Sequence, residues 1–279
     1  MKRKILTIVA GAAGLVAAYF LVSGISHIIY DRPAEATPTE SETQTAEQGT
    51  EEAKAAMTED EINEMLEGMK STGTEETEAV SEEKAVIPVK FEELWQVNPD
   101  VYAWITIPGT EIDYPILQHP SDNSYYLMHN IDGSYGYPGC VYTENLNSRD
   151  FTDNNTVIYG HNMKNGSMFG MLKKYRADET LYNTSKYFWI LTPEKDYRYE
   201  IISAYTTSVN SDTYTLFKGP GKEFLEYEKK MLQNSEIKTE AGQEEANVKD
   251  KIVTLSTCTG NQATRFVVQG KRVNAVDPQ

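Results

Sequence analysis

Eight short segments rich in β-branched and aromatic residues, all beyond Val89, constrain the fold of this chain more than any other feature. Turn residues such as Pro108-Gly109 separate them, and these residue types favour strands over helices. Few helical segments stand between them, so the strands are expected to close into a barrel that leaves little free edge. The sequence therefore predicts a mainly β fold. The predicted strands are residues 101–107, 112–117, 140–143, 156–160, 187–192, 197–209, 251–257 and 265–270.

Helices are predicted only at the periphery of this barrel. The most distinct one follows Gly219-Pro220-Gly221 and places Phe224 and Met231 on one side. The sequence contains neither an internal repeat nor a glycine-rich phosphate-binding loop. The predicted helices are residues 91–97, 122–130, 167–175 and 222–234.

The first thirty residues have the composition of a membrane anchor. Residues 5–29 are almost wholly apolar, and at about 1.5 Å per residue such a helix crosses a hydrocarbon core of roughly 30 Å. Lys2, Arg3 and Lys4 precede the run, which places the N-terminus in the cytoplasm and the remaining chain outside. We therefore expect residues 1–30 to form a cytoplasmic tip and a single-pass transmembrane helix in the cell membrane.

A cleaved signal peptide is the alternative interpretation of this segment, because it begins with the same kind of basic residues. The apolar run is long for a signal peptide, and no convincing A-x-A cleavage site closes it. These two features favour an uncleaved anchor.

Residues 31–88 are predicted to be an acidic, flexible stalk. They contain 17 acidic and 4 basic residues and no aromatic residue, so they cannot bury enough apolar surface to fold alone. One short helix is expected inside the stalk, because Thr58 and Glu61 have the spacing of a capping box. It would either dock on the following domain or form transiently. Its apolar face would consist of Ile62, Met65, Leu66 and Met69.

The charge and cysteine content exclude several classes of function. The chain has a net charge of −16, and residues 89–279, the predicted folded domain, still carry 25 acidic against 19 basic residues. Nucleic-acid binding is therefore not expected, since it needs a basic face. Two widely spaced cysteines form neither a disulfide framework nor a four-cysteine zinc site. No set of ligands has metal-binding spacing, so we expect neither a metal nor a cofactor.

Cys258 is the first candidate for chemistry. It directly follows a predicted strand, and Arg265 opens the next strand after a short loop, so a β-hairpin would place the two side by side. A cysteine beside a fixed cation can be an activated thiolate. It can equally be a small buried hydrophobic residue beside a surface charge, and these two residues alone favour neither interpretation.

His161 is the second candidate, because it also directly follows a predicted strand, in the run Tyr-Gly-His-Asn-Met. Two residues that leave strands at the same end of a barrel can converge although almost a hundred positions separate them. Cysteine and histidine are the minimal pair for thiol nucleophilic catalysis, and Arg265 could then stabilise an oxyanion. The alternative is a loop histidine without a partner.

The remaining histidines and the second cysteine are weaker candidates. His27 belongs to the anchor, and His119 and His129 flank a predicted helix with no cysteine nearby. Cys140 enters a strand and is expected to be a buried thiol. A disulfide between Cys140 and Cys258 would consume the nucleophile, which argues against it.

Two motifs resemble those of a known family. Thr254-Leu255-Ser256-Thr257-Cys258, followed by Arg265, resembles the T-L-x-T-C…R signature of the sortases. The stretch from Val157 through His161 to Gly170 resembles the histidine motif of class B sortases. The resemblance covers about residues 90–275, and the predicted anchor and the helix at 222–234 agree with it.

The resemblance implies a closed sortase-type β-barrel and a cysteine transpeptidase. It implies that Cys258 is the nucleophile, His161 the general acid/base and Arg265 the cation that binds the oxyanion or orients the substrate. The supporting residues would be Ser256, Thr257 and Asn162. The expected partners are secreted proteins with a C-terminal sorting signal, cleaved through a thioacyl intermediate, and an amine of a peptidoglycan precursor.

Two alternatives to cell-wall attachment remain open at this point. One is a pilin polymerase, in which the acceptor is a lysine of another subunit, and the other is a non-catalytic surface binding module. Many class B sortases have an acidic residue directly after the cysteine, whereas Thr259 follows here. The loop to Arg265 is also short, and both departures concern substrate preference. Class B resemblance suggests an Asn-Pro-x-Thr-like signal.

Overall fold

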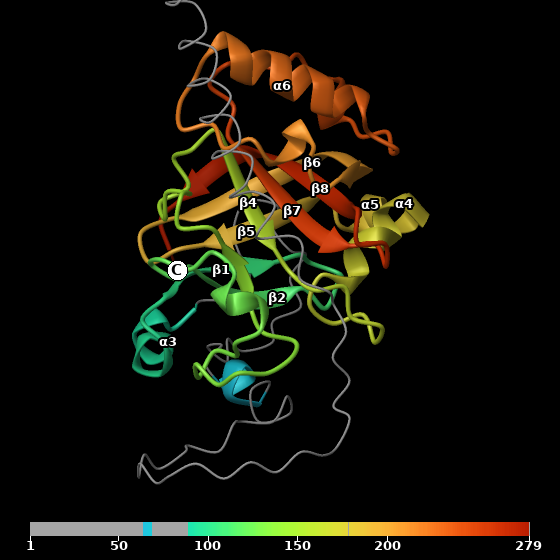
Figure 1. The fold of residues 1–279 in the computed structure, drawn as a ribbon. Helices are drawn as coiled ribbons and strands as arrows, with labels where there is room; N and C mark the ends of the chain where they lie inside the picture. Colours follow the sequence, from blue (N-terminus) through green and yellow to red (C-terminus); the bar gives the residue numbers. More distant parts are fainter. Residues whose placement is uncertain (1–63, 69–88, 178, 279) are drawn as a thin grey trace, which may run out of the picture. The chain divides into compact units, whose positions relative to one another are not determined.

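Eight strands close into a barrel in the computed structural model, which describes residues 64–68, 89–177 and 179–278 (Figure 1). Their order around the described barrel is β1-β2-β3-β4-β7-β8-β6-β5. The pairs β2/β3 and β4/β7 are parallel, and the other neighbours are antiparallel. The mainly β prediction is confirmed. The strands are β1 (Val101–Thr106), β2 (Asp113–Leu117), β3 (Val141–Thr143), β4 (Asn155–Tyr159), β5 (Tyr187–Leu191), β6 (Asp196–Ser208), β7 (Ile252–Cys258) and β8 (Thr264–Val276).

Each strand corresponds to a predicted one, and only β8 differs much in length. It continues six residues beyond the predicted end at 270. The extra part alternates polar residues with small apolar ones and pairs with the start of β6, where Asp196 is the partner of Val276. Lys271, Arg272 and Asn274 interrupt its apolar residues, and Val273 and Ala275 are exposed, so no continuous apolar run marks this part of the strand in the sequence.

The helices follow the prediction at both ends of the domain but not in its middle. Residues 91–97 are helical as predicted, and the predicted helix 222–234 ends one residue earlier. The predicted helix 167–175 is instead a 3₁₀ turn followed by a short α-helix, and the α5 helix was not predicted. The elements are α3 (Phe91–Val97), η1 (Tyr125–Leu127), η2 (Gly170–Lys173), α4 (Lys174–Ala177), α5 (Glu179–Thr184), η3 (Asp212–Tyr214), α6 (Lys222–Gln233) and η4 (Ala241–Gln243).

The predicted helix at 122–130 is wrong, because only the 3₁₀ turn η1 forms there. Tertiary contacts use the carbonyl groups that an α-helix would need. The carbonyl of Tyr126 accepts from the amide of Cys140, and the carbonyl of Met128 accepts from the amide of Gly136. Local helix propensity is weak compared with such a set of long-range hydrogen bonds.

Three apolar clusters hold the domain together. The largest fills the barrel, with Ile105, Phe188 and Leu255 completely buried. A second lies between the outside of the barrel and α3, and a third lies under α6, where Phe224 and Met231 are buried against β6 and β8 residues (Figure 1). None of these clusters is centred on the C-terminal ends of β4 and β7, where the loops with the candidate site residues begin.

The structure describes five residues of the short helix predicted near residues 58–69. Residues 64–68 are helical, and Leu66 is buried in one cluster with Phe91 and Leu94 of α3. Met65 packs against the same cluster. Of the two expected behaviours, docking on the domain is therefore the one observed for this segment.

The predicted anchor, residues 1–30, and most of the predicted stalk, residues 31–88, lie outside the described residues. Among the helices that the structure does describe, none has both the length and the apolar character needed to cross a bilayer.

Glu228, on the buried face of α6, gives a first prediction. Its side chain is 1% exposed, and burial together with the neighbouring carboxylate of Asp250 raises the pKa of Glu228 to about 8. An unfolded chain loses this proton near pH 4.5, so the folded state keeps a proton that the unfolded state has lost. The free energy of unfolding should therefore fall as pH rises from about 5 to 8, by up to about 1.4 kcal/mol per pH unit.

Glu228→Gln should remove most of this dependence, because the amide has no proton to lose. Denaturant unfolding of the wild type and the variant at pH 5.5, 7 and 8.5 measures it. Glu223→Gln, on an exposed part of the same helix, is the matched control and should leave the slope unchanged. Parallel curves for wild type and Glu228→Gln would contradict the prediction.

Candidate active site

Cys258 and Arg265 face each other across the last hairpin of the barrel. Cys258 is the final residue of β7, and its register partner in β8 is Arg265, so their Cα atoms lie about 5 Å apart. Cys258 is partly exposed, whereas the preceding residues of β7 are buried. Arg265 donates from Nη1 to the carbonyls of Gln262 and Thr264, at 3.0 and 2.9 Å. The strand register thus places the two residues side by side at the end of the hairpin.

The parallel pairing of β4 with β7 brings His161 to the same end of the barrel. Tyr159 pairs with Ser256, and the next residue, Gly160, donates its amide to the Ser256 carbonyl at 3.1 Å. Beyond the strands, Asn162 donates from Nδ2 to the carbonyl of Cys258 at 2.7 Å. His161 lies between these two cross-links, so the backbone holds it level with Cys258.

The backbone approach at Gly160 allows no side chain. A Cβ atom there would lie 2.7 Å from the ring of Phe169, which is completely buried. The amide of Phe169 in turn donates to the carbonyl of His161 at 2.9 Å. Glycine at position 160 therefore lets the Phe169 ring pack against the backbone just before His161. The Phe169 amide then fixes the His161 carbonyl by a hydrogen bond.

The imidazole of His161 is held by the loop between β2 and β3. Its Nε2 atom lies 2.9 Å from the carbonyl oxygen of Leu127, and the ring of Tyr137 lies edge-on with centroids 4.9 Å apart. Because a carbonyl only accepts, Nε2 carries the proton and the lone pair is on Nδ1.

Burial and the positive charge of Arg265 lower the pKa of His161, and the hydrogen bond to Leu127 opposes them. The neutral imidazole is therefore the favoured form at neutral pH.

The three predicted supporting residues connect the two strand ends. Thr257 donates its hydroxyl to the Gly160 carbonyl at 2.8 Å, and Asn162 bonds to the Cys258 carbonyl. The buried Ser256 hydroxyl is 2.9 Å from the hydroxyl of Tyr214, which lies in η3. The sequence analysis did not identify Tyr214 or Leu127, because no motif or spacing relates them to the strands that they contact.

Cys140 and the other histidines do not join this site. Both cysteines are free thiols, so the disulfide considered above is not formed. Cys140 is buried, its Sγ donates to the His129 carbonyl, and burial raises the pKa of its thiol. His119 and His129 stack on the ring of Tyr125. His27 lies outside the described residues.

A thiol, an imidazole and a guanidinium at one end of a barrel can perform nucleophilic acyl transfer. The part of the chain that the structure describes offers no group of three or more His, Cys, Asp or Glu side chains arranged to hold a metal.

Comparison with known proteins agrees with the motifs. The Sortase domain family model matches residues 105–273. Sortase B of Listeria monocytogenes is 38% identical over 189 residues, covering 66% of this chain and 74% of the relative. The structure of Clostridium perfringens sortase B matches with a TM-score of 0.60 and 31% identity, covering 66% of this chain and all of that one.

A third match is a solved Staphylococcus aureus sortase B–substrate complex, with a TM-score of 0.60 and 26% identity. It covers 66% of this chain and 84% of that chain. The family match spans more than half of the residues, and these relatives are class B sortases. The chain therefore belongs to the sortase family of cysteine transpeptidases, and to its class B branch.

Proposed function

We propose that this protein is anchored in the cell membrane by residues 1–30 and cleaves a C-terminal sorting signal of secreted proteins on the outer side. It then joins each protein to an amine of peptidoglycan. The apolar run behind Lys2, Arg3 and Lys4 supports the anchor and its orientation. The class B relatives support the reaction, and a substrate-bound structure exists for one of them.

In the proposed first step, Cys258 passes its thiol proton to the neutral imidazole of His161, and the resulting thiolate attacks the carbonyl carbon of the scissile peptide bond. The oxyanion of the tetrahedral intermediate is stabilised by the guanidinium of Arg265, a permanent charge with fixed N–H donors. When the C–N bond breaks, protonated His161 gives its proton to the departing amine. The products are a thioacyl enzyme and the released C-terminal segment.

In the proposed second step, neutral His161 accepts a proton from the incoming acceptor amine as its nitrogen attacks the thioacyl carbon. The C–S bond then breaks, the amide bond forms, and the sulfur leaves as the thiolate. His161 then returns the proton to the Cys258 sulfur, which restores the neutral thiol and imidazole for the next turnover. The reaction needs no net oxidant, reductant or cofactor.

One observation carries this proposal: the convergence of three residues from distant parts of the chain. β8 pairing places Arg265 beside Cys258, and the Asn162–Cys258 hydrogen bond ties the residue after His161 to the same position. A surface binding module would need none of these contacts.

The test is direct detection of the thioacyl enzyme. The purified full-length protein is incubated with sorting-signal peptides, including Asn-Pro-x-Thr sequences, without an acceptor amine. We expect intact-mass and peptide mass spectrometry to find the N-terminal fragment of the peptide on Cys258, and hydroxylamine to release it. Absence of the adduct with every peptide would contradict the proposed function.

A further inference from the structure

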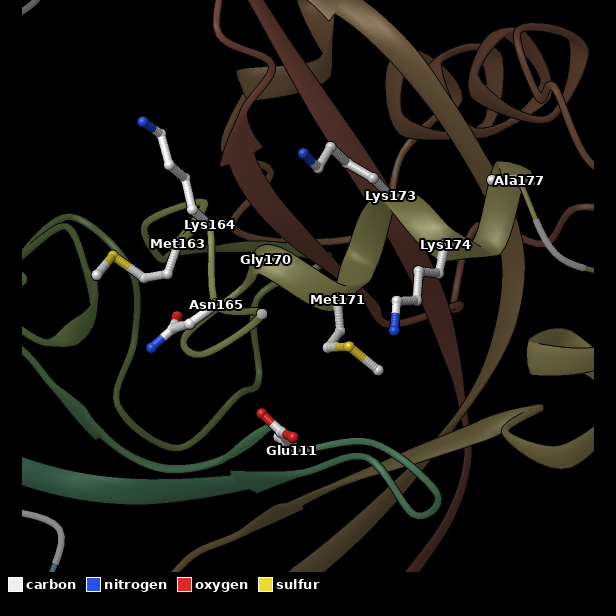
Figure 2. Close-up of a pocket in the computed structure, with 10 residues that line it drawn as sticks. Glu111, Met163, Lys164, Asn165, Gly170, Met171, Lys173, Lys174 and Ala177 are labelled. Carbon is white, nitrogen blue, oxygen red and sulfur yellow. The ribbon is translucent and has the colours of Figure 1, made fainter.

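A pocket lies directly beyond the histidine-bearing loop (Figure 2). It has a volume of about 440 Å³ and opens between the β1–β2 turn, which contributes Glu111, and the segment 163–177. Met163 and Met171 supply apolar surface, and three lysine side chains stand around the opening. The pocket is separate from Cys258 but begins two residues after His161.

The charge of this pocket differs from that of the domain. Its lining contains Lys164, Lys173 and Lys174 against one carboxylate, Glu111, so the lining is positive by two charges. The domain as a whole is acidic. None of the three lysines forms an ion pair with another residue that the structure describes, whereas Lys186, for example, pairs with Glu240. Three like charges on one concave surface, without an ion pair among the described residues, attract an anion.

Backbone contacts form the pocket wall without any ligand. The amide of Gly166 donates to the Met163 carbonyl at 3.1 Å, with Gly166 at a φ of +94°. At Gly170 a Cβ atom would lie 2.6 Å from the same carbonyl, so the loop closes tightly on itself. The amide of Met168 donates to the hydroxyl of Tyr114 at 3.0 Å, which fastens the loop to β2. A ligand would therefore meet a preformed surface.

The same loop supports His161. Asn162 pairs with Met168 in an isolated bridge, and the next amide, that of Phe169, donates to the His161 carbonyl. The pocket residue Met163 directly follows Asn162 in the chain, and the pocket residue Gly170 directly follows Phe169. A molecule seated in the pocket thus lies on the His161 side of the site.

From this placement we propose that the lysine pocket binds the carboxylates of an acidic peptide that carries the acceptor amine. The inference rests on the proposed function and extends it to the acceptor. The attacking amine gives its proton to His161, so the acceptor must reach the thioacyl carbon beside this residue. Lys164, Lys173 and Lys174 attract the carboxylates as flexible point charges. Glu111 is placed to accept N–H groups of the same peptide.

The test compares two acceptors that differ only in charge, Gly-Gly-Gly-Glu-Glu and Gly-Gly-Gly-Gln-Gln, each with an amidated C-terminus. With a fixed donor peptide, the wild-type KM for the glutamate acceptor should be about tenfold lower, as expected for a few exposed ion pairs. Lys164→Gln/Lys173→Gln/Lys174→Gln should raise that KM to the value of the glutamine acceptor. The KM for the donor and the rate of Cys258 acylation should not change.

The matched control is Lys229→Gln/Lys238→Gln/Lys249→Gln, which removes three exposed lysines outside the pocket and changes the net charge equally. It should retain the preference. Equal KM values for the two acceptors in the wild type, or equal losses in both triple variants, would overturn the proposal. An acceptor with two phosphoserines in place of the glutamates distinguishes phosphate from carboxylate, and its preferential use would overturn the carboxylate assignment.

Failure of the proposed function would be visible separately from failure of the pocket. If Cys258 does not acylate before any acceptor is added, the transpeptidase mechanism itself is wrong. If acylation proceeds and only the charge preference is missing, the lysine pocket alone is refuted.

Discussion

Cys258→Ala is expected to abolish both cleavage of a sorting-signal peptide and transfer to an amine, because it removes the only atom proposed to form the acyl bond. Turnover should fall to the background rate of the buffer, while the folded structure remains, since Cys258 is at a partly exposed strand end. Peptide cleavage followed by mass spectrometry, with far-UV circular dichroism as the check on folding, measures this.

The chain provides its own control for this experiment in its second thiol. Cys140 is buried, and burial raises the pKa of its thiol, so it stays protonated and unreactive at neutral pH. Cys140→Ala should cost about 1 kcal/mol of stability for the buried sulfur but leave the activity of the folded protein unchanged. If Cys258→Ala retains the wild-type rate, or if Cys140→Ala is the inactive variant, the nucleophile has been assigned wrongly.

The barrel could be predicted because most of its strands are local patterns of apolar and β-branched residues. The failures occurred where long-range contacts decide the backbone. Residues 122–130 have helical spacing, yet their carbonyls bond to Gly136 and Cys140. The end of β8 mixes polar and apolar residues, and it is a strand because β6 offers it a partner.

Cys258, His161 and Arg265 could be identified as candidates because each lies within two residues of a strand end, and strand pairing brings such ends close together. Contacts supplied by loops could not be predicted in this way. The Leu127 carbonyl that fixes the imidazole tautomer lies 34 residues from His161 and contributes only backbone, which no motif marks. Tyr214 reaches Ser256 from 42 residues away through a turn whose path the sequence does not specify.

The lysine pocket was missed for a different reason. Its positive charges are two neighbouring residues, Lys173 and Lys174, and a third nine positions earlier, which is an ordinary surface pattern in sequence. Only the tight turns at Gly166 and Gly170 bring them around one cavity with Glu111. The acceptor side of the site thus depends on loop geometry, whereas the nucleophile side depends on strand register.

His161→Ala is expected to lower kcat/KM by about 10²- to 10⁴-fold, the usual contribution of a general acid/base. The loss should appear in Cys258 acylation, where the leaving amine needs a proton, and in transfer, where the acceptor amine must lose one. His119→Gln is the matched control, because this histidine stacks on Tyr125 away from the cysteine and should change kcat/KM by no more than about twofold.

The pH profile gives this prediction a readout that misfolding would not produce. Because burial and the charge of Arg265 lower the pKa of His161, the neutral imidazole persists below pH 6.5. The acid limb of transfer should therefore lie below pH 6.5 in the wild type, and it should be missing from the residual activity of His161→Ala. Removing the Arg265 charge with Arg265→Gln should move the limb upward, since one cause of the lowered pKa is gone. If His161→Ala keeps both the wild-type rate and the acid limb, another group carries the proton. His161 would then have no catalytic role despite its contact with the Leu127 carbonyl.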